Sequence, residues 1–250
     1  MDAHRFRADL YELAEKACAG DSQEVRVKVF AVADTLVNLY RKNHVKINHS
    51  ALELVCAKSL IRQGYSVKVE HKVDRSLVCD VMGVRGDGNL VVEIETGFIP
   101  PEAALQPSAF ARSRIASKIA RYSKFAGEFA LGTTPSYILD LPQFFVKPPR
   151  ERTVEEAMEV KALTDVRYNK PAISVEELML ARLHMIFLID VDRGTTRELD
   201  PETYVRGARS LLDLRNTVQA LNSESPTHTD SDSKTGRLKE HGYRGSVRDA

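Results

Sequence analysis

The 250-residue sequence contains no tryptophan, only three cysteines and no long apolar run. The cysteines Cys18, Cys56 and Cys79 are too few and too irregularly spaced for a disulfide framework or a CxxC zinc site. The chain starts without an apolar signal core, and no segment approaches the roughly 20 apolar residues of a membrane-spanning helix. These absences predict a cytoplasmic protein with no membrane partner.

The sequence also has no large excess of positive over negative residues, or of negative over positive. The formal net charge is +1, from 36 lysines and arginines against 35 acids, so a nucleic-acid surface would have to be a local patch. With no tryptophan and 7% aromatic residues, the sequence shows no evident platform for base stacking. It also lacks a phosphate loop, a G-x-S-x-G elbow and zinc-ligand spacing of histidines, which argues against nucleotide-binding proteins, serine hydrolases and zinc enzymes.

The most informative stretch is a pair of β-branched runs around a glycine-rich turn. Residues 85–88, Arg-Gly-Asp-Gly, have the turn chemistry of a β-hairpin. On the second strand Glu93 and Glu95 leave the same face, because strand side chains alternate, and Asp80 lies near the same end of the facing strand. Three converging carboxylates need a neutralising cation, and oxygen ligands favour Mg²⁺ or Mn²⁺.

The order Asp80, hairpin turn, Glu93-Ile94-Glu95 resembles the core of the PD-(D/E)XK superfamily, the restriction-endonuclease-like nucleases. Cys79-Asp80 stands where the family often has Pro-Asp, and Glu95 stands where it has lysine. Some type II restriction enzymes are similar in having glutamate there. A Glu-x-Glu pair is also typical of the solvated face of an amphipathic sheet.

The resemblance covers about residues 48–140 and implies an α/β fold, with a central mixed β-sheet flanked by helices. It implies a metal-dependent nuclease that hydrolyses phosphodiester bonds in DNA, in repair, recombination or restriction. Because the lysine is replaced, an alternative stays open: a catalytically inactive protein of nuclease fold that binds nucleic acid or serves as a structural subunit.

The resemblance also implies roles for single residues. Asp80 and Glu93 would bind the metal, and Glu95 would act as a general base or bind a second ion. In the family a helix before the first core strand often adds a glutamate to the metal site, and Glu53 matches it. Ser50 and Glu53 also fit a capping box at a helix start, and both roles are left open.

A basic stretch follows the hairpin from residue 112 to residue 124. Arg114, Lys118 and Arg121 recur at helical spacing on one stripe, beside an apolar stripe that would pack on the sheet. Such a helix would hold cations beside the carboxylates, where phosphates could bind. In some family members the displaced lysine reappears on this helix, which makes Lys118 the fourth predicted catalytic residue. Arg112, Arg114, Lys118 and Arg121 are the predicted nucleic-acid contacts, and an ordinary solvated helix face is the alternative.

Periodicity divides the chain into four segments. These are an N-terminal helical segment (1–47), the nuclease-like core (48–145), a helical C-terminal extension (146–221) and a polar tail expected to be disordered (222–250). The first segment, with helices over 4–18 and 22–43, would cover the core or form a homodimer contact. Strands near 128–132 and 136–140 would complete the sheet, while 185–189 fits the end of a helix or a buried strand.

Overall fold

The computed structural model describes residues 2–223. Its contacts divide the chain into two units, Met1–Ser210 and Leu211–Ala250, and the whole sheet belongs to the first. The helices are α1 (Ala3–Ala17), α2 (Gln23–Arg41), α3 (Ile47–Arg62), α4 (Pro107–Tyr122), α5 (Gln143–Val146), α6 (Val154–Asp165), α7 (Val175–Leu180) and α8 (Pro201–Ser223). The strands are β1 (Ser66–Lys72), β2 (Val78–Arg85), β3 (Gly88–Glu95), β4 (Glu128–Thr133), β5 (Met185–Asp190) and β6 (Thr195–Leu199).

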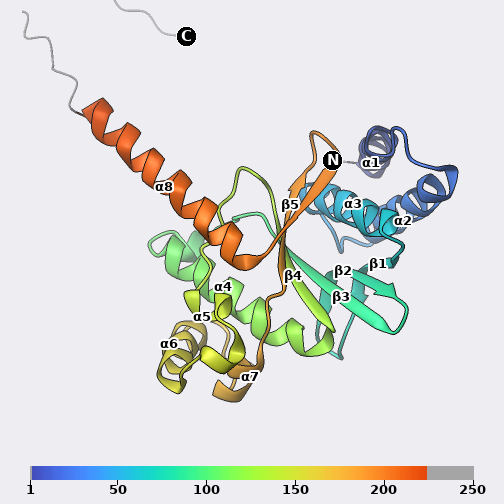
Figure 1. Ribbon diagram of the computed structural model, residues 1–250. Coiled ribbons are helices and arrows are strands. Elements are labelled where there is room, and N and C mark those ends of the chain that lie inside the picture. Colours follow the sequence, from blue (N-terminus) through green and yellow to red (C-terminus); the bar gives the residue numbers. More distant parts are fainter. Residues whose placement is uncertain (1, 224–250) are drawn as a thin grey trace, which may run out of the picture. The chain divides into compact units, whose positions relative to one another are not determined.

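A six-stranded mixed sheet, with its strands in sequence order from β1 to β6, organises this unit (Figure 1). β1, β2 and β3 pair antiparallel, as do β5 and β6, whereas β4 pairs parallel with both of its neighbours. Parallel neighbours need a crossover connection, and α4 joins β3 to β4 while α5 to α7 lie between β4 and β5. The predicted α/β fold with a mixed sheet and flanking helices is confirmed.

Alternation along the strands sends side chains into two separate apolar cores. Val92 and Ile94 pack with α1, α2 and α3 on one face, and Val91 packs with α4, α5 and α6 on the other. The N-terminal helices therefore cover the sheet, one of the two roles that their apolar periodicity predicted. Glu93 and Glu95, which alternate with Val92 and Ile94, extend toward α4.

The sheet extends further along the chain than the sequence indicated. Residues 136–140 form no strand, and the Leu139 N–H donates to the hydroxyl of Tyr204 at 2.7 Å instead of to a neighbouring strand. The run 185–189 is strand β5, buried between β4 and β6, so it is apolar throughout instead of alternating. The expectation that the sheet ends near residue 140 is wrong.

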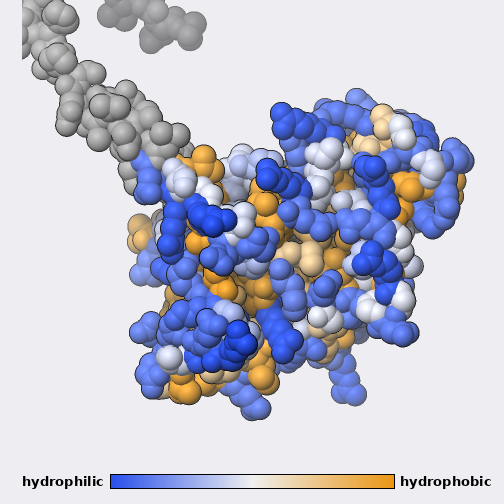
Figure 2. Space-filling view, in the orientation of Figure 1, coloured by the Kyte–Doolittle hydropathy of each residue, from blue (hydrophilic) through white to orange (hydrophobic). Residues whose placement is uncertain are grey.

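The surface carries few apolar patches on the face that Figure 2 shows. Apolar residues gather over α6 and α7, where Val154, Met158 and Leu180 are more than half exposed. Among the described residues, no helix is both long and apolar enough to cross a bilayer. The predicted tail lies outside the described residues from position 224 onward.

Candidate metal centre

The hairpin places two carboxylates at the end away from its turn. Val81 pairs with Val92, so Asp80 and Glu93 come next to each other on β2 and β3. The backbone N–H of Asp80 donates to Oε1 of Glu93 at 3.3 Å, and the N–H of Ile94 donates to Oδ2 of Asp80 at 2.5 Å. The structure thus brings these two predicted residues together, with the strand backbone fixing their orientation.

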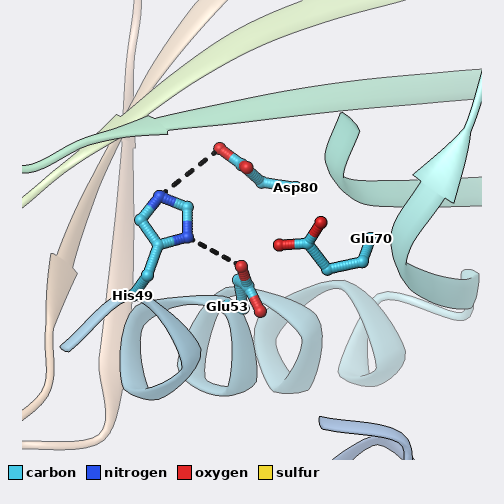
Figure 3. Close-up of side chains that lie close together, drawn as sticks. All are labelled: His49, Glu53, Glu70 and Asp80. Carbon is cyan, nitrogen blue, oxygen red and sulfur yellow. Dashed lines mark hydrogen bonds and ion pairs between the residues drawn. The ribbon is translucent and has the colours of Figure 1, made fainter. Parts of the chain in front are cut away.

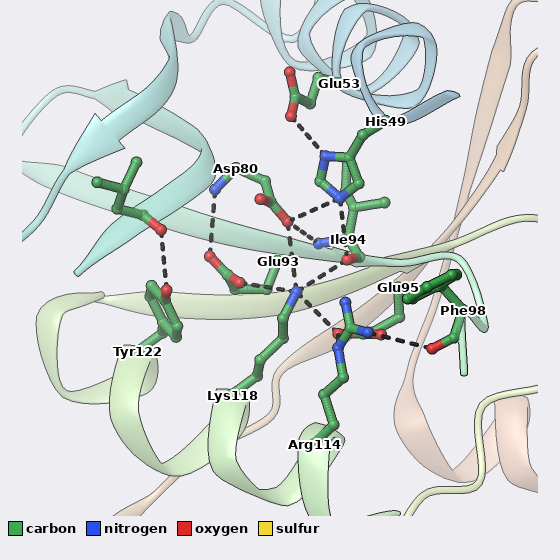
Figure 4. A network of polar contacts seen from close by, with 11 residues as sticks. His49, Glu53, Asp80, Glu93, Ile94, Glu95, Phe98, Arg114, Lys118 and Tyr122 are labelled. Carbon is green, nitrogen blue, oxygen red and sulfur yellow. Dashed lines mark hydrogen bonds and ion pairs between the residues drawn. The ribbon is translucent and has the colours of Figure 1, made fainter. Parts of the chain in front are cut away.

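Lys118 of α4 lies among the carboxylates of the hairpin (Figure 4). Its Nζ is 3.0 Å from Oε2 of Glu93, 2.9 Å from Oε1 of Glu95 and 3.7 Å from Oδ2 of Asp80. It also donates to the carbonyl oxygen of Ile94 at 3.0 Å. We call Asp80, Glu93, Glu95 and Lys118 the lysine cluster.

The charges of the lysine cluster are strongly coupled. Burial raises the pKa of Glu93 to about 8; the charge of Asp80 adds to the rise and Lys118 opposes it. Burial would lower the pKa of Lys118, but the three carboxylates of the cluster raise it above its ordinary value. The ammonium group is therefore charged at every pH at which the protein would work.

A second cluster also includes Asp80 (Figure 3). His49 and Glu53 come from α3, Glu70 from β1 and Asp80 from β2, and we call these four the histidine cluster. Nδ1 of His49 is 2.7 Å from Oε1 of Glu53, and its Nε2 is 3.7 Å from Oδ2 of Asp80. Asp80 is common to both clusters.

Glu70 joins the histidine cluster through an unusual backbone conformation. Its φ is +47°, a left-handed value that costs a non-glycine residue about 1–3 kcal/mol. The β1–β2 register pairs Val69 with Val81 and His71 with Cys79. Glu70 and Asp80 lie between these two pairs and are not paired in the register. The side chain of Glu70 points into the space between Asp80 and Glu53 (Figure 3).

Burial is the largest influence on the pKa values of the two glutamates of the histidine cluster. It raises the pKa of Glu70 to about 8, and the charges of Glu53 and Asp80 add to this rise. It also raises the pKa of Glu53, although His49 acts in the opposite direction. Burial would lower the pKa of His49, but the hydrogen bond with Glu53 and the charge of Asp80 raise it to about 9.

The two clusters together hold more negative than positive charge. Their carboxylates number five, and the cations among them are protonated His49, Lys118 and Arg114, whose Nε is 3.0 Å from Oε1 of Glu95. With every group ionised, two negative charges remain, and with His49 neutral, as a metal ligand must be, three remain. A divalent ion would reduce this excess. Burial is the main cause of the raised pKa values of Glu70 and Glu93, and the charges of neighbouring carboxylates add to the rise.

The histidine cluster has donors suited to a metal ion. One ligand atom from each of its four residues lies within 4.8 Å of all the others. Ligands at about 2.0–2.2 Å from an ion stand at most about 4.4 Å apart, so small side-chain movements would close the site. Glu53 is fully buried, and its Oε2 has no hydrogen-bond partner among the described residues. An orphaned carboxylate oxygen at this position fits a cation, and the group could hold a metal ion.

Of the two roles left open for Glu53, the prediction that it caps a helix is wrong. α3 begins at Ile47, after Lys46, so Ser50 and Glu53 lie inside the helix instead of at its start. The hydroxyl of Ser50 is buried and finds no hydrogen-bond partner within residues 2–223. His49 and Glu53 instead stand four residues apart on one face of α3, the face that meets the hairpin.

The predicted nucleic-acid contacts lie in different surroundings. Arg114 contacts Glu95, whereas Arg112 pairs with Asp140 at 3.6 Å. Arg121 donates to the carbonyl oxygens of Tyr168 and Pro171, at 3.1 Å and 2.8 Å, and so holds a loop.

Sequence reasoning missed His49 and Glu70. The position of His49 one helical turn before Glu53 is a signal that could have revealed it. No comparable signal exists for Glu70, because regular alternation along β1 does not predict a left-handed residue. No protein-family model, curated protein or solved structure matches this chain, so its own geometry carries the interpretation.

Proposed function

We propose that this protein is a metal-dependent nuclease that hydrolyses phosphodiester bonds in DNA, related in its core to the restriction-endonuclease-like enzymes. The observation that carries the proposal is the position of Lys118. Its ammonium group is 3.0 Å from Glu93 and 2.9 Å from Glu95, so α4 supplies the positive charge that the Glu-x-Glu strand lacks. The histidine cluster beside it supports the metal requirement.

Each cluster has a part in the proposed chemistry. The residues His49, Glu53, Glu70 and Asp80 would hold the divalent ion, Mg²⁺ or Mn²⁺, with Glu93 adjacent. When bound, such an ion supplies an activated water and positive charge for the transition state. Lys118 would stabilise negative charge on the phosphate oxygens, and Glu95, salt-bridged to Lys118 and Arg114, would hold both cations in place.

One observation favours a second candidate function. Lys118 already contacts Asp80, Glu93 and the Ile94 carbonyl, the groups that the family resemblance assigns to the metal. A lysine that permanently neutralises these oxygens would suit a protein that keeps the fold and binds nucleic acid without cleaving it. That protein would show affinity that falls with salt, but no metal-dependent product.

The test is incubation of labelled linear, flapped and four-way-junction DNA with the protein in Mg²⁺ or Mn²⁺. Asp80→Asn removes a carboxylate shared by both clusters, and Glu102→Gln changes an exposed acid outside them as the matched control. We expect cleavage by the native protein and the control, and none by Asp80→Asn. Binding without cleavage in all three would replace the nuclease with the non-catalytic binder.

A further inference from the structure

An exposed aromatic ring lies beside the lysine cluster. Phe98 follows β3 closely in the chain, and 64% of its surface is exposed. A phenylalanine side chain left largely in water forgoes the favourable free energy of apolar burial. The exposed ring is therefore accessible to a ligand that reaches this charged site.

The turn that carries Phe98 has a fixed geometry. Gly97 has a φ of +76°, and a Cβ at this position would lie 2.5 Å from the ring of Tyr137, so only glycine fits. Arg114 then joins the turn to the site, because its Nε contacts Glu95 at 3.0 Å and its NH1 donates to the Phe98 carbonyl oxygen at 3.4 Å. One guanidinium thus positions the Phe98 backbone relative to Glu95 (Figure 4).

Cations that are paired with carboxylates lie near the turn, and the side chain of Phe98 is left available. Among the described residues, Phe98 takes part in no ring stacking or cation–π contact. Arg112 is about half exposed on α4, and Lys118 and Arg114 lie at the carboxylates. Positive charge beside a free aromatic ring is the combination that binds single-stranded nucleic acid, with phosphates on the cations and a base on the ring.

We infer that Phe98 is a stacking platform for an unpaired base next to the phosphate that reaches the lysine cluster. This inference rests on the proposed function and names its substrate class: DNA with unstacked nucleotides at the site of cleavage, as in single strands, flaps and frayed ends. Inside a duplex both faces of each base are covered by neighbouring pairs, and a side chain reaches a base face only after the base is unstacked, which is energetically unfavourable.

The protein has no tryptophan, so Phe98→Trp would introduce a single fluorescent reporter at the ring position. The matched control is Leu105→Trp, which places the same reporter in the following loop at a residue that is 98% exposed. Both variants are titrated in chelator, where no metal-dependent cleavage occurs, with an oligothymidine single strand and with a blunt hairpin duplex. We expect the single strand to quench Phe98→Trp, the duplex to quench it far less, and Leu105→Trp to change little.

A second pair of variants measures the contribution to affinity. Stacking on an aromatic ring contributes about 1–3 kcal/mol per base, so Phe98→Ala should weaken single-strand binding about 5-fold to 150-fold. Leu105→Ala should leave the affinity unchanged. Equal quenching of the two tryptophan variants, or unchanged binding by Phe98→Ala, would overturn the inference.

Failure of this inference is distinguishable from failure of the proposed function. Metal-dependent cleavage by the native protein without selective quenching would remove the stacking role and keep the nuclease. Selective quenching without any cleavage would keep the stacking platform and remove the nuclease.

Discussion

Replacing Lys118 by methionine tests whether its ammonium group holds the lysine cluster together. Methionine keeps most of the apolar length of the lysine side chain, so the change removes the charge with little loss of packing. Glu93 and Glu95 are almost fully buried and would lose their nearest cation. Removing one partner of a buried ion pair costs about 3–5 kcal/mol.

The expected loss of stability lies at the lower end of that range. The side chain of Lys118 is 17% exposed to solvent. Glu93, whose pKa is already raised to about 8, can also take up a proton and so relieve the repulsion between the carboxylates. We therefore expect Lys118→Met to lower the free energy of unfolding by about 3 kcal/mol, or the melting temperature by roughly 6–12 °C. The loss should be greater at pH 9 than at pH 6, where a protonated Glu93 needs no cation.

The assay is urea and thermal unfolding beside Lys124→Met. Lys124 pairs with Glu177 at 2.9 Å, but its side chain is 48% exposed, so its removal should cost at most about 1 kcal/mol. Equal effects of the two substitutions would refute the reasoning, because Lys118 would then be an ordinary surface lysine.

Three further predictions concern pH, a metal ligand and a buried cation. The folded-state pKa values of His49 (about 9), Glu70 and Glu93 (about 8) exceed the ordinary values of 6.5 and 4.5. Their stabilising contribution is complete below the unfolded pKa values and is lost as pH rises through the folded ones. The metal-free protein should lose a few kcal/mol of stability between about pH 4.5 and pH 9, and melting temperatures in chelator that do not fall would contradict this. His49→Ala should lower the affinity for Co²⁺ by about tenfold and that for Mg²⁺ less, because imidazole favours transition metals; an unchanged Co²⁺ affinity in calorimetry would exclude a ligand role. Arg152 is buried and donates to four backbone carbonyls, so Arg152→Met should cost roughly 2–4 kcal/mol in urea unfolding, whereas exposed Arg150→Met should cost under about 0.5 kcal/mol.

The parts of the site that follow regular periodicity could be predicted from the sequence. The two-residue spacing of Glu93 and Glu95 fixed their common face, and the hairpin turn fixed their relation to Asp80. The seven-residue stripe on α4 placed Lys118 and Arg114 beside them. These inferences needed only one element and its neighbour.

The parts that failed depend on tertiary structure. Thr195–Leu199 is a short, polar edge strand without apolar alternation, and its partner β5 decides its conformation. The helix that carries Glu53 begins at Ile47, three residues before Ser50, where the capping-box pattern predicted its start. Glu70 reaches the histidine cluster only through a left-handed backbone in the middle of a strand. Local sequence patterns describe none of these.

The central claim is that the histidine cluster holds the divalent ion of a nuclease. The most direct measurement is diffraction at the manganese absorption edge from crystals soaked in Mn²⁺, with Asp80→Asn crystals treated identically. We predict one anomalous peak in the native protein, within about 2.5 Å of ligand atoms from His49, Glu53, Glu70 and Asp80, and its loss in the variant. A native map with no peak at these residues, or an unchanged peak in Asp80→Asn, would contradict the account.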